Sequence, residues 1–123
     1  RKRPLHTIIP AMALRGGRPV LSFGVMGGAY QPTGVVHTLQ NVVDFGMDVQ
    51  EALDAPRGFR LAGAFEAERG IAESVLGELQ ARGHPVARAA FPWGAGQMIA
   101  MRPESGLLSA GSDPRRDGVA VAL

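Results

Sequence analysis

The sequence predicts an α/β or α+β protein whose strands and helices pack in layers. Apolar, partly β-branched segments open the chain, helical periodicity occupies its middle, and short apolar segments return towards its end. Strands followed by helices and then by strands again are typical of a layered sheet and not of a repeat array. With 123 residues, the chain is a single piece that amounts to one domain or part of a larger one.

A β-hairpin is predicted at the start of the chain. The apolar segments at residues 7–14 and 19–25 flank the turn sequence Arg-Gly-Gly-Arg. Two β-rich segments around such a turn pair antiparallel. Because Pro10 cannot donate to a strand ladder, part of the first strand should lie at a sheet edge or carry a bulge.

The first helix is predicted after Gly27-Gly28. Pro32 lies near its start and Gly46 follows its end, as is common at helix termini. Apolar residues recur at helical spacing between these two positions. They are Val35, Val36, Leu39, Val42 and Val43.

Two shorter helices and several strands follow. A helix is predicted over 48–57, where Asp48 and Glu51 have the spacing of a capping box. Another is predicted over 71–82, with Gly83 as its C-cap and an apolar face of Ile71, Val75 and Leu79. Short strands are then predicted at 85–91, 97–102 and 107–111, with a turn at 103–106 and a final apolar segment at 118–123.

Composition excludes several classes of protein. Hydrophobic residues make up 46% and charged residues 20% of the chain, and the formal net charge is +2, so neither nucleic acid nor a membrane surface is expected as a partner. No apolar segment approaches the roughly 18 residues that span a bilayer, and no secretory signal sequence is evident. The absence of cysteine excludes disulfides and thiolate sites. It leaves the compartment open between cytoplasm and periplasm.

Gly27 and Gly28 form the one candidate anion site. Two glycines between a strand and a helix place backbone N–H groups where the helix dipole favours negative charge, and the missing Cβ atoms permit close approach. From the local pattern alone, a plain turn that needs positive φ is the favoured explanation of the pair. The spacings of the known phosphate-binding glycine loops are absent.

Other candidate groups are more weakly indicated. His6 and Thr7 could bind a carboxylate or assist proton transfer at the start of the first strand. The three histidines are scattered without carboxylates at ligand spacing, so neither a metal site nor a cofactor is expected. Residues 110–118 suit a charged hairpin loop, in which Arg115 or Arg116 could pair with a nearby carboxylate.

The order of the motifs resembles the gamma-glutamyltransferase (gamma-glutamyltranspeptidase) family. The matching segments are KRPLHTIIPAM, GVMGGAYQPTG, LQNVVDFGMDVQEALDAPR, ERG before a helix, and GSDPRRDGVAV. The resemblance covers nearly the whole chain. It implies part of a four-layer αββα N-terminal-nucleophile (Ntn) hydrolase fold, in a precursor that cleaves itself into a large and a small subunit.

The resemblance also implies roles for four residues. Gly27 and Gly28 match the paired glycines whose N–H groups form the family's oxyanion hole. His6 and Thr7 fall where well-studied members carry a Ser-Ser pair that binds the substrate's α-carboxylate. With His-Thr in place of Ser-Ser, the sequence resembles a divergent, cephalosporin-acylase-like branch of the family.

The chain resembles the C-terminal part of the small subunit, without a counterpart of the family's nucleophilic Thr. We therefore expect a fragment of an enzyme that transfers or hydrolyses gamma-glutamyl compounds such as glutathione, inactive by itself. Its expected partners are the substrate, the large subunit, the missing part of the small subunit and other protomers of an oligomer. An acylase on other amides and a non-catalytic assembly module are the alternatives. A fragment of such a sandwich should expose one apolar sheet face.

Overall fold

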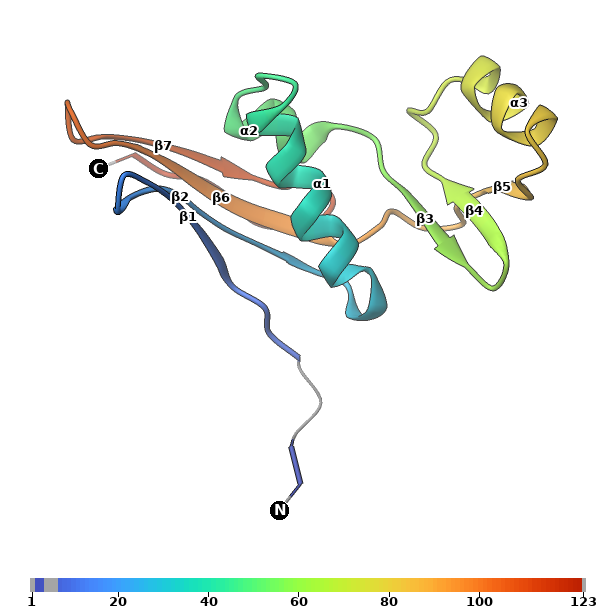
Figure 1. Ribbon diagram of the computed structural model, residues 1–123, viewed down its shortest axis with the longest axis horizontal. Helices are drawn as coiled ribbons and strands as arrows, with labels where there is room; N and C mark the ends of the chain where they lie inside the picture. Colours follow the sequence, from blue (N-terminus) through green and yellow to red (C-terminus); the bar gives the residue numbers. More distant parts are fainter. Residues whose placement is uncertain (1, 4–6, 123) are drawn as a thin grey trace. The chain divides into compact units, whose positions relative to one another are not determined.

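The computed structural model describes residues 2–3 and 7–122, and these form two compact units. The first unit comprises Arg1–Asp54 and Gly94–Leu123, and the second comprises Ala55–Trp93. A four-stranded sheet with helices packed on it dominates the first unit (Figure 1), and a three-stranded sheet with one helix dominates the second. The predicted mixed α/β class is confirmed. No helix in the described ranges is long and apolar enough to cross a membrane.

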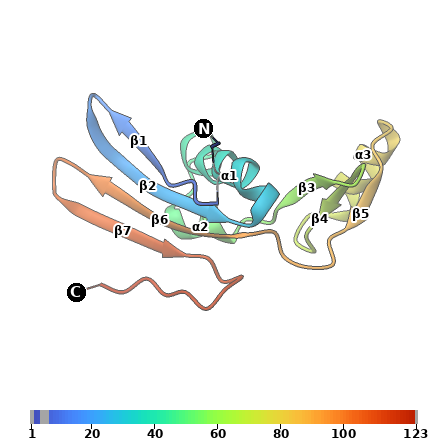
Figure 2. The ribbon, with the colours of Figure 1, turned by 90° about the horizontal axis from the view of Figure 1, so that it is seen from below.

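The sheet of the first unit is antiparallel throughout, with the strand order β1-β2-β6-β7 (Figure 2). The predicted hairpin is confirmed, but its first strand begins at Ala11 rather than at residue 7. As Pro10 suggests, this strand lies at the sheet edge, and its pairing shifts register between Ala13 and Leu14. The strands are β1 (Ala11–Arg15), β2 (Arg18–Met26), β6 (Ala95–Arg102) and β7 (Leu107–Ser112).

Helices cover one face of this sheet. A short 3₁₀ turn, η1 (Gly28–Tyr30), leads directly into α1 (Gln31–Val43), and α2 (Val49–Asp54) follows. Side chains alternate between the two faces along a strand, so alternate residues of β2 and β6 meet these helices. The buried core consists of Leu21, Phe23, Val49, Leu53 and Met98.

The first helix is confirmed, but its apolar stripe differs from the prediction. Val36 and Val43 are 54% and 65% exposed. The helix lies so close to the sheet that a Cβ on Gly34 would stand 2.7 Å from Val25 Cγ1. Small or polar residues therefore fill its innermost positions. The predicted residues that do pack against the core are Val35, Leu39 and Val42.

The capping box of α2 is confirmed. The Glu51 N–H donates to Asp48 Oδ1 at 2.8 Å, and the Asp48 N–H donates to Glu51 Oε2 at 2.9 Å. These two bonds satisfy donors that the first turn of a helix leaves without intrahelical partners. The helix is shorter than predicted and ends at Asp54.

The opposite face of the same sheet carries exposed apolar side chains. Met12 and Ile99 lie in one cross-strand row with Ser22 between them, and they are 60% and 42% exposed. Met26 and Leu108 extend this face and are 52% and 63% exposed. The expected apolar sheet face is therefore present.

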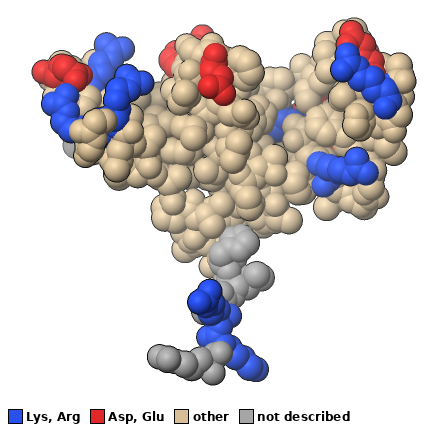
Figure 3. Space-filling view, in the orientation of Figure 1, with Lys and Arg blue, Asp and Glu red and all other residues tan. Residues whose placement is uncertain are grey.

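Charged side chains gather at the end of the sheet that the two hairpin turns form (Figure 3). There Arg18 Nη2 lies 2.6 Å from Glu104 Oε1. Both side chains are exposed, so this ion pair contributes only about 0–1 kcal/mol. The charges mark the solvated end of the sheet and leave its broad face apolar.

The second unit contains a hairpin that is not among the predicted elements. Strands β3 (Gly58–Leu61) and β4 (Ala64–Ala67) pair antiparallel across a two-residue turn. After α3 (Glu73–Ala81), strand β5 (Val86–Arg88) pairs parallel to β4. The predicted strand at 85–91 is thus confirmed in shortened form.

Helix α3 is confirmed, but its predicted apolar face is only partly correct: Ile71 and Leu79 are half-buried, whereas Val75 is not. Val75 is 48% exposed, and its neighbour Leu76 is the buried residue, at 5% exposure. The helix end agrees with the prediction. Gly83 has a φ of 85°, and the His84 N–H donates to the Leu79 carbonyl at 3.0 Å, which closes the last turn.

The carboxylate of Glu68 joins the two ends of the second unit. Glu68 Oε2 accepts the Arg57 N–H at 2.9 Å, and Oε1 accepts the Trp93 N–H at 2.7 Å. The buried Arg57 side chain donates from Nη1 to the Trp93 carbonyl at 2.8 Å. The Trp93 ring also packs edge-on against Phe59, with centroids 5.1 Å apart.

Replacing Glu68 by alanine should lower the free energy of unfolding by about 3 kcal/mol, because a buried and a half-buried N–H group lose a charged acceptor. Chemical denaturation of the full-length protein measures this loss. Glu66→Ala, two residues earlier on β4, is the matched control and should cost less than about 1 kcal/mol. Equal losses for the two variants would contradict the role of the Glu68 carboxylate.

Candidate functional site

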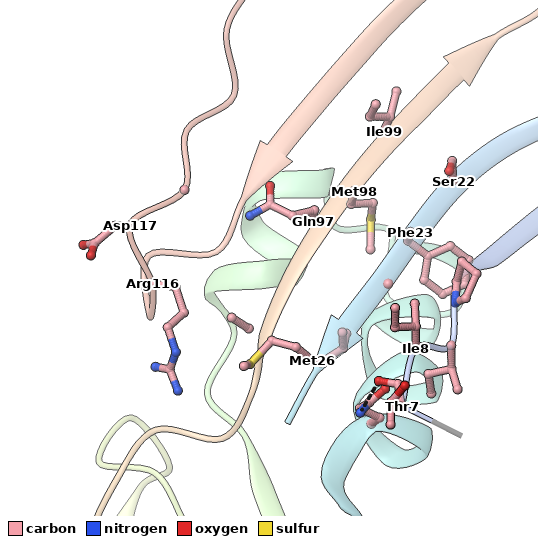
Figure 4. Close-up of a pocket in the computed structure, with 17 residues that line it drawn as sticks. Thr7, Ile8, Ser22, Phe23, Met26, Gln97, Met98, Ile99, Arg116 and Asp117 are labelled. Carbon is pink, nitrogen blue, oxygen red and sulfur yellow. Dashed lines mark hydrogen bonds between the residues drawn. The ribbon is translucent and has the colours of Figure 1, made fainter. Parts of the chain in front are cut away.

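A groove of about 700 Å³ lies on the exposed face of the first unit's sheet. Figure 4 shows Ser22, Met26, Gln97 and Ile99 projecting from β2 and β6, with Thr7 at one side and the segment after β7 at the other. The complete lining is Thr7, Ile8, Ile9, Pro10, Ser22, Phe23, Gly24, Val25, Met26, Gln31, Ala95, Gln97, Met98, Ile99, Arg116, Asp117 and Gly118.

Gly27 and Gly28 lie between two residues that line this groove, Met26 at the end of β2 and Gln31 at the start of α1. Both glycines adopt positive φ, 138° for Gly27 and 57° for Gly28. A side chain at either position would strain the backbone. The positive φ expected for this turn is confirmed.

The turn presents backbone donors at the start of a helix. The Tyr30 N–H donates to the Gly27 carbonyl at 3.1 Å, which closes η1. The N–H groups of the first residues of a helix have no intrahelical acceptor. The N–H groups that begin this turn therefore stand at the positive end of the η1–α1 dipole, where an anionic oxygen is favoured.

Gly94 determines the path of the Gly27 backbone. A Cβ on Gly27 would lie 3.0 Å from Gly94 Cα, so the two backbones are in direct contact. Gly94 itself has a φ of 64°, and a Cβ there would lie only 2.4 Å from the Met26 carbonyl oxygen. Neither residue can carry a side chain without moving the other. The sequence does not indicate this contact, because the two glycines are far apart in the chain.

Gly94→Ala should therefore displace the Gly27 turn and lower both stability and any activity that depends on the turn. We expect a loss of about 1–3 kcal/mol, from the positive φ together with the clash. The control is Gly106→Ala, since Gly106 has a φ of 71° and open space around it. Thermal unfolding and turnover of the full-length protein compare the variants, and a Gly94 variant no worse than the Gly106 variant would contradict the contact.

Asp113 anchors the strand that follows Gly94. The Gly96 N–H donates to Asp113 Oδ2 at 2.8 Å, and the Asp113 N–H donates to the Gly96 carbonyl at 3.1 Å. Arg115 Nη1 lies 3.2 Å from Asp113 Oδ1 and donates to the Leu53 carbonyl at 2.8 Å. This ion pair couples the end of β7 to β6 and to the last turn of α2.

The charged-loop interpretation of residues 110–118 is therefore wrong for its central part. Asp113 is fully buried, and the Arg115 side chain is only 10% exposed. Turn-forming residues are usually exposed, and the sequence alone does not indicate that β6 and α2 close over this one. The predicted pairing of Arg115 with a carboxylate is confirmed, whereas Arg116 lies at the side of the groove (Figure 4) and donates from Nη1 to the Arg115 carbonyl at 2.6 Å.

Thr7 and the two histidines that the structure describes lie in different surroundings. Thr7 lines the groove, and its carbonyl accepts a hydrogen bond from Gln31 Nε2 at 3.2 Å. His6 lies outside the described residues. His37 is half-buried on α1, and His84 is exposed after α3. Among the described residues, no three His, Cys, Asp or Glu side chains group as metal ligands would.

Known sequences match this chain over its full length. The family model described as gamma-glutamyltranspeptidase matches residues 1–123. A glutathione hydrolase-like YwrD proenzyme of Bacillus subtilis is 33% identical, over 100% of this chain and 25% of its own length. An acylase ACY 1 proenzyme of a Pseudomonas species is 35% identical, over 99% of this chain and 22% of its own length. The chain thus spans about a quarter of the length of these relatives.

Solved structures also superpose on nearly the whole of this chain. A cephalosporin acylase from Bacillus halodurans superposes with a TM-score of 0.90 and 36% identity, over 96% of this chain and 23% of its own. A gamma-glutamyltranspeptidase from Pseudomonas nitroreducens, complexed with L-DON, superposes with a TM-score of 0.87 and 27% identity. That match covers 99% of this chain and 65% of the solved one.

Proposed function

This chain belongs to the gamma-glutamyltranspeptidase family, and from that premise we propose that it supplies the oxyanion-binding and donor-binding part of an enzyme acting on gamma-glutamyl compounds. The complete protein would hydrolyse such compounds, glutathione among them, or transfer the gamma-glutamyl group to an amine. The observation that carries the proposal is the double-glycine turn, whose backbone donors stand at a helix start beside the groove.

The rest of the polypeptide would contribute the nucleophile, an N-terminal Thr. Its hydroxyl oxygen would attack the amide carbonyl carbon of the substrate, while its proton passes to a base. Negative charge then develops on the carbonyl oxygen. The N–H groups of Gly27 and Gly28 would donate to that oxygen, and such donors contribute about 10²–10³ in rate because they are already oriented.

Collapse of this tetrahedral intermediate breaks the carbon–nitrogen bond, and the amine leaves with a proton. The gamma-glutamyl group would then be held as an ester on the Thr oxygen. Attack by water releases glutamate, and attack by an amine gives a new gamma-glutamyl amide. The same backbone donors would serve both halves of the reaction, since each passes through an oxyanion at the same carbon.

We assign donor recognition to Thr7, whose hydroxyl would bind the α-carboxylate of the substrate, together with His6. Thr7 lines the groove, and a hydroxyl is a suitable donor to a carboxylate oxygen. The match of Bacillus and Pseudomonas relatives along the whole chain supports the proposed type of reaction.

The exposed sheet face supports the involvement of further polypeptide. Met12, Ile99 and Leu108 present apolar surface that a soluble monomer would normally cover. The missing subunit segments are the occupants we propose, in keeping with the much greater length of the relatives.

The full-length proenzyme tests this proposal directly. Incubation should produce two subunits by self-cleavage, and the processed protein should release the coloured amine from gamma-glutamyl p-nitroanilide. A precursor that remains intact and inactive would contradict the proposal and favour a non-catalytic assembly module.

An acylase acting on other amides is the second candidate. The observation that favours it is the 36% identity to the solved cephalosporin acylase, above the 27% identity to the solved gamma-glutamyltranspeptidase. Glutaryl p-nitroanilide, which keeps the carboxylate and lacks only the α-amino group, distinguishes the two, because an acylase of this kind should prefer it to gamma-glutamyl p-nitroanilide. If Thr7 binds the donor's α-carboxylate, Thr7→Ala should weaken the use of gamma-glutamyl p-nitroanilide and leave butyryl p-nitroanilide, which lacks both the α-amino and the α-carboxylate groups, unchanged.

A further inference from the structure

Gln31 is a buried amide with a partner far away in the chain. The side chain is 7% exposed, and Nε2 donates to the Thr7 carbonyl at 3.2 Å (dashed line in Figure 4). Burying a primary amide without hydrogen bonds destabilises the folded state, because the amide loses its bonds to water. An apolar side chain at the same position would not carry this desolvation cost. The bond therefore explains why this position holds a glutamine.

The position of Gln31 in the fold means that this bond joins two different kinds of segment. Gln31 is the first residue of α1 and follows η1, so its backbone is continuous with the Gly28 turn. Thr7, by contrast, precedes β1, and residues 7–10 belong to no strand. One end of the bond is thus on a rigid helix start, and the other is on a segment without a strand ladder.

We propose that Gln31 is a positioning residue that sets the distance between the Thr7 segment and the Gly27-Gly28 turn. This inference rests on the proposed function. The contact between Gln31 and Thr7 would couple recognition of the donor's carboxylate to the point where the oxyanion forms. The amide does not touch the substrate. It acts through the Thr7 main chain, and a misplacement of about 1 Å between two such groups is enough to impair a reaction strongly.

The test uses Gln31→Met in the full-length proenzyme, since methionine keeps the length of the side chain and removes the donor. The KM for gamma-glutamyl p-nitroanilide should rise roughly three- to tenfold, the range that the loss of one hydrogen bond gives, with kcat changed less. Gln40→Met is the matched control, because Gln40 is exposed on the same helix. It should leave both constants unchanged.

A double-mutant cycle separates positioning from a general structural role. Once Thr7→Ala has removed the hydroxyl, adding Gln31→Met should raise KM no further, because both changes act on the same contact. Gln31→Glu keeps the shape and polarity but opposes a carboxylate to the Thr7 carbonyl, and it should behave like the methionine variant. Additive effects of Thr7→Ala and Gln31→Met on KM would overturn the proposal.

The crystal structure of the Gln31→Met variant gives a readout that does not depend on the substrate. Thr7 should be displaced relative to Gly28 or lose its single position. Thr7 held at its original distance would overturn the positioning role, whichever substrates the enzyme accepts. A displaced Thr7 in an enzyme without gamma-glutamyl activity would instead leave the positioning contact standing and contradict the proposed function.

Discussion

Gly28→Ala in the full-length protein is expected to lower kcat about a hundredfold, because the new methyl group stands where the substrate carbonyl must approach the backbone. Nothing lies within 4 Å of the Cβ position on Gly28, so the change meets no protein atom there. The space is free for a ligand. A displacement of the reacting carbonyl by about 1 Å is sufficient for an effect of this size.

Gly16→Ala is a matched control for this experiment. Gly16 lies in the β1–β2 turn with the same φ of 57° and the same open surroundings as Gly28. Both substitutions should therefore cost a similar 1–2 kcal/mol for a left-handed backbone. Equal loss of activity in the two variants, measured as kcat on gamma-glutamyl p-nitroanilide, would contradict a special role of Gly28.

Asp113→Ala is expected to destabilise the protein by about 3–5 kcal/mol, because it leaves the Arg115 guanidinium buried without this carboxylate. The substitution also removes the acceptor of the Gly96 N–H. The midpoint of chemical denaturation of the full-length protein measures the effect, and activity should fall with it, since Gly96 lies close to the Gly94 contact.

The control for the Asp113 substitution is Asp117→Ala. Asp117 is exposed and lies four residues further along the same segment, so its removal should change stability by less than about 0.5 kcal/mol. A small effect at Asp113, comparable with that at Asp117, would mean that the buried ion pair contributes little to the fold.

Elements whose signals are local could be predicted from the sequence. The β1–β2 hairpin, α1 and the Asp48–Glu51 capping box follow from turn residues, helical spacing and a three-residue interval, and the structure contains all three. The β3–β4 hairpin could not be predicted, because each strand has only four residues and the connecting Ala62-Gly63 turn is not one of the strong hairpin signals.

Burial could not be predicted where tertiary contacts determine it. Whether Val75 or Leu76 faces inwards depends on how α3 meets β5, and Asp113 is buried because β6 and α2 close over a turn-rich segment. In the candidate site, the sequence suggests Gly27, Gly28 and Thr7, whose roles stay predictions. Gly94 and Gln31 could not be identified from the sequence, because each acts through one contact to a distant segment.

We propose that the Gly27 and Gly28 N–H groups hold the oxyanion. A crystal structure of the processed full-length protein, with a gamma-glutamyl phosphonate bonded to its nucleophile, tests it most directly, because the phosphonyl oxygen imitates the oxyanion. We predict that this oxygen lies about 2.7–3.1 Å from the nitrogens of Gly27 and Gly28. A phosphonyl oxygen bound to other donors, with both glycine nitrogens beyond hydrogen-bond distance, would contradict an oxyanion-binding role of the two glycines.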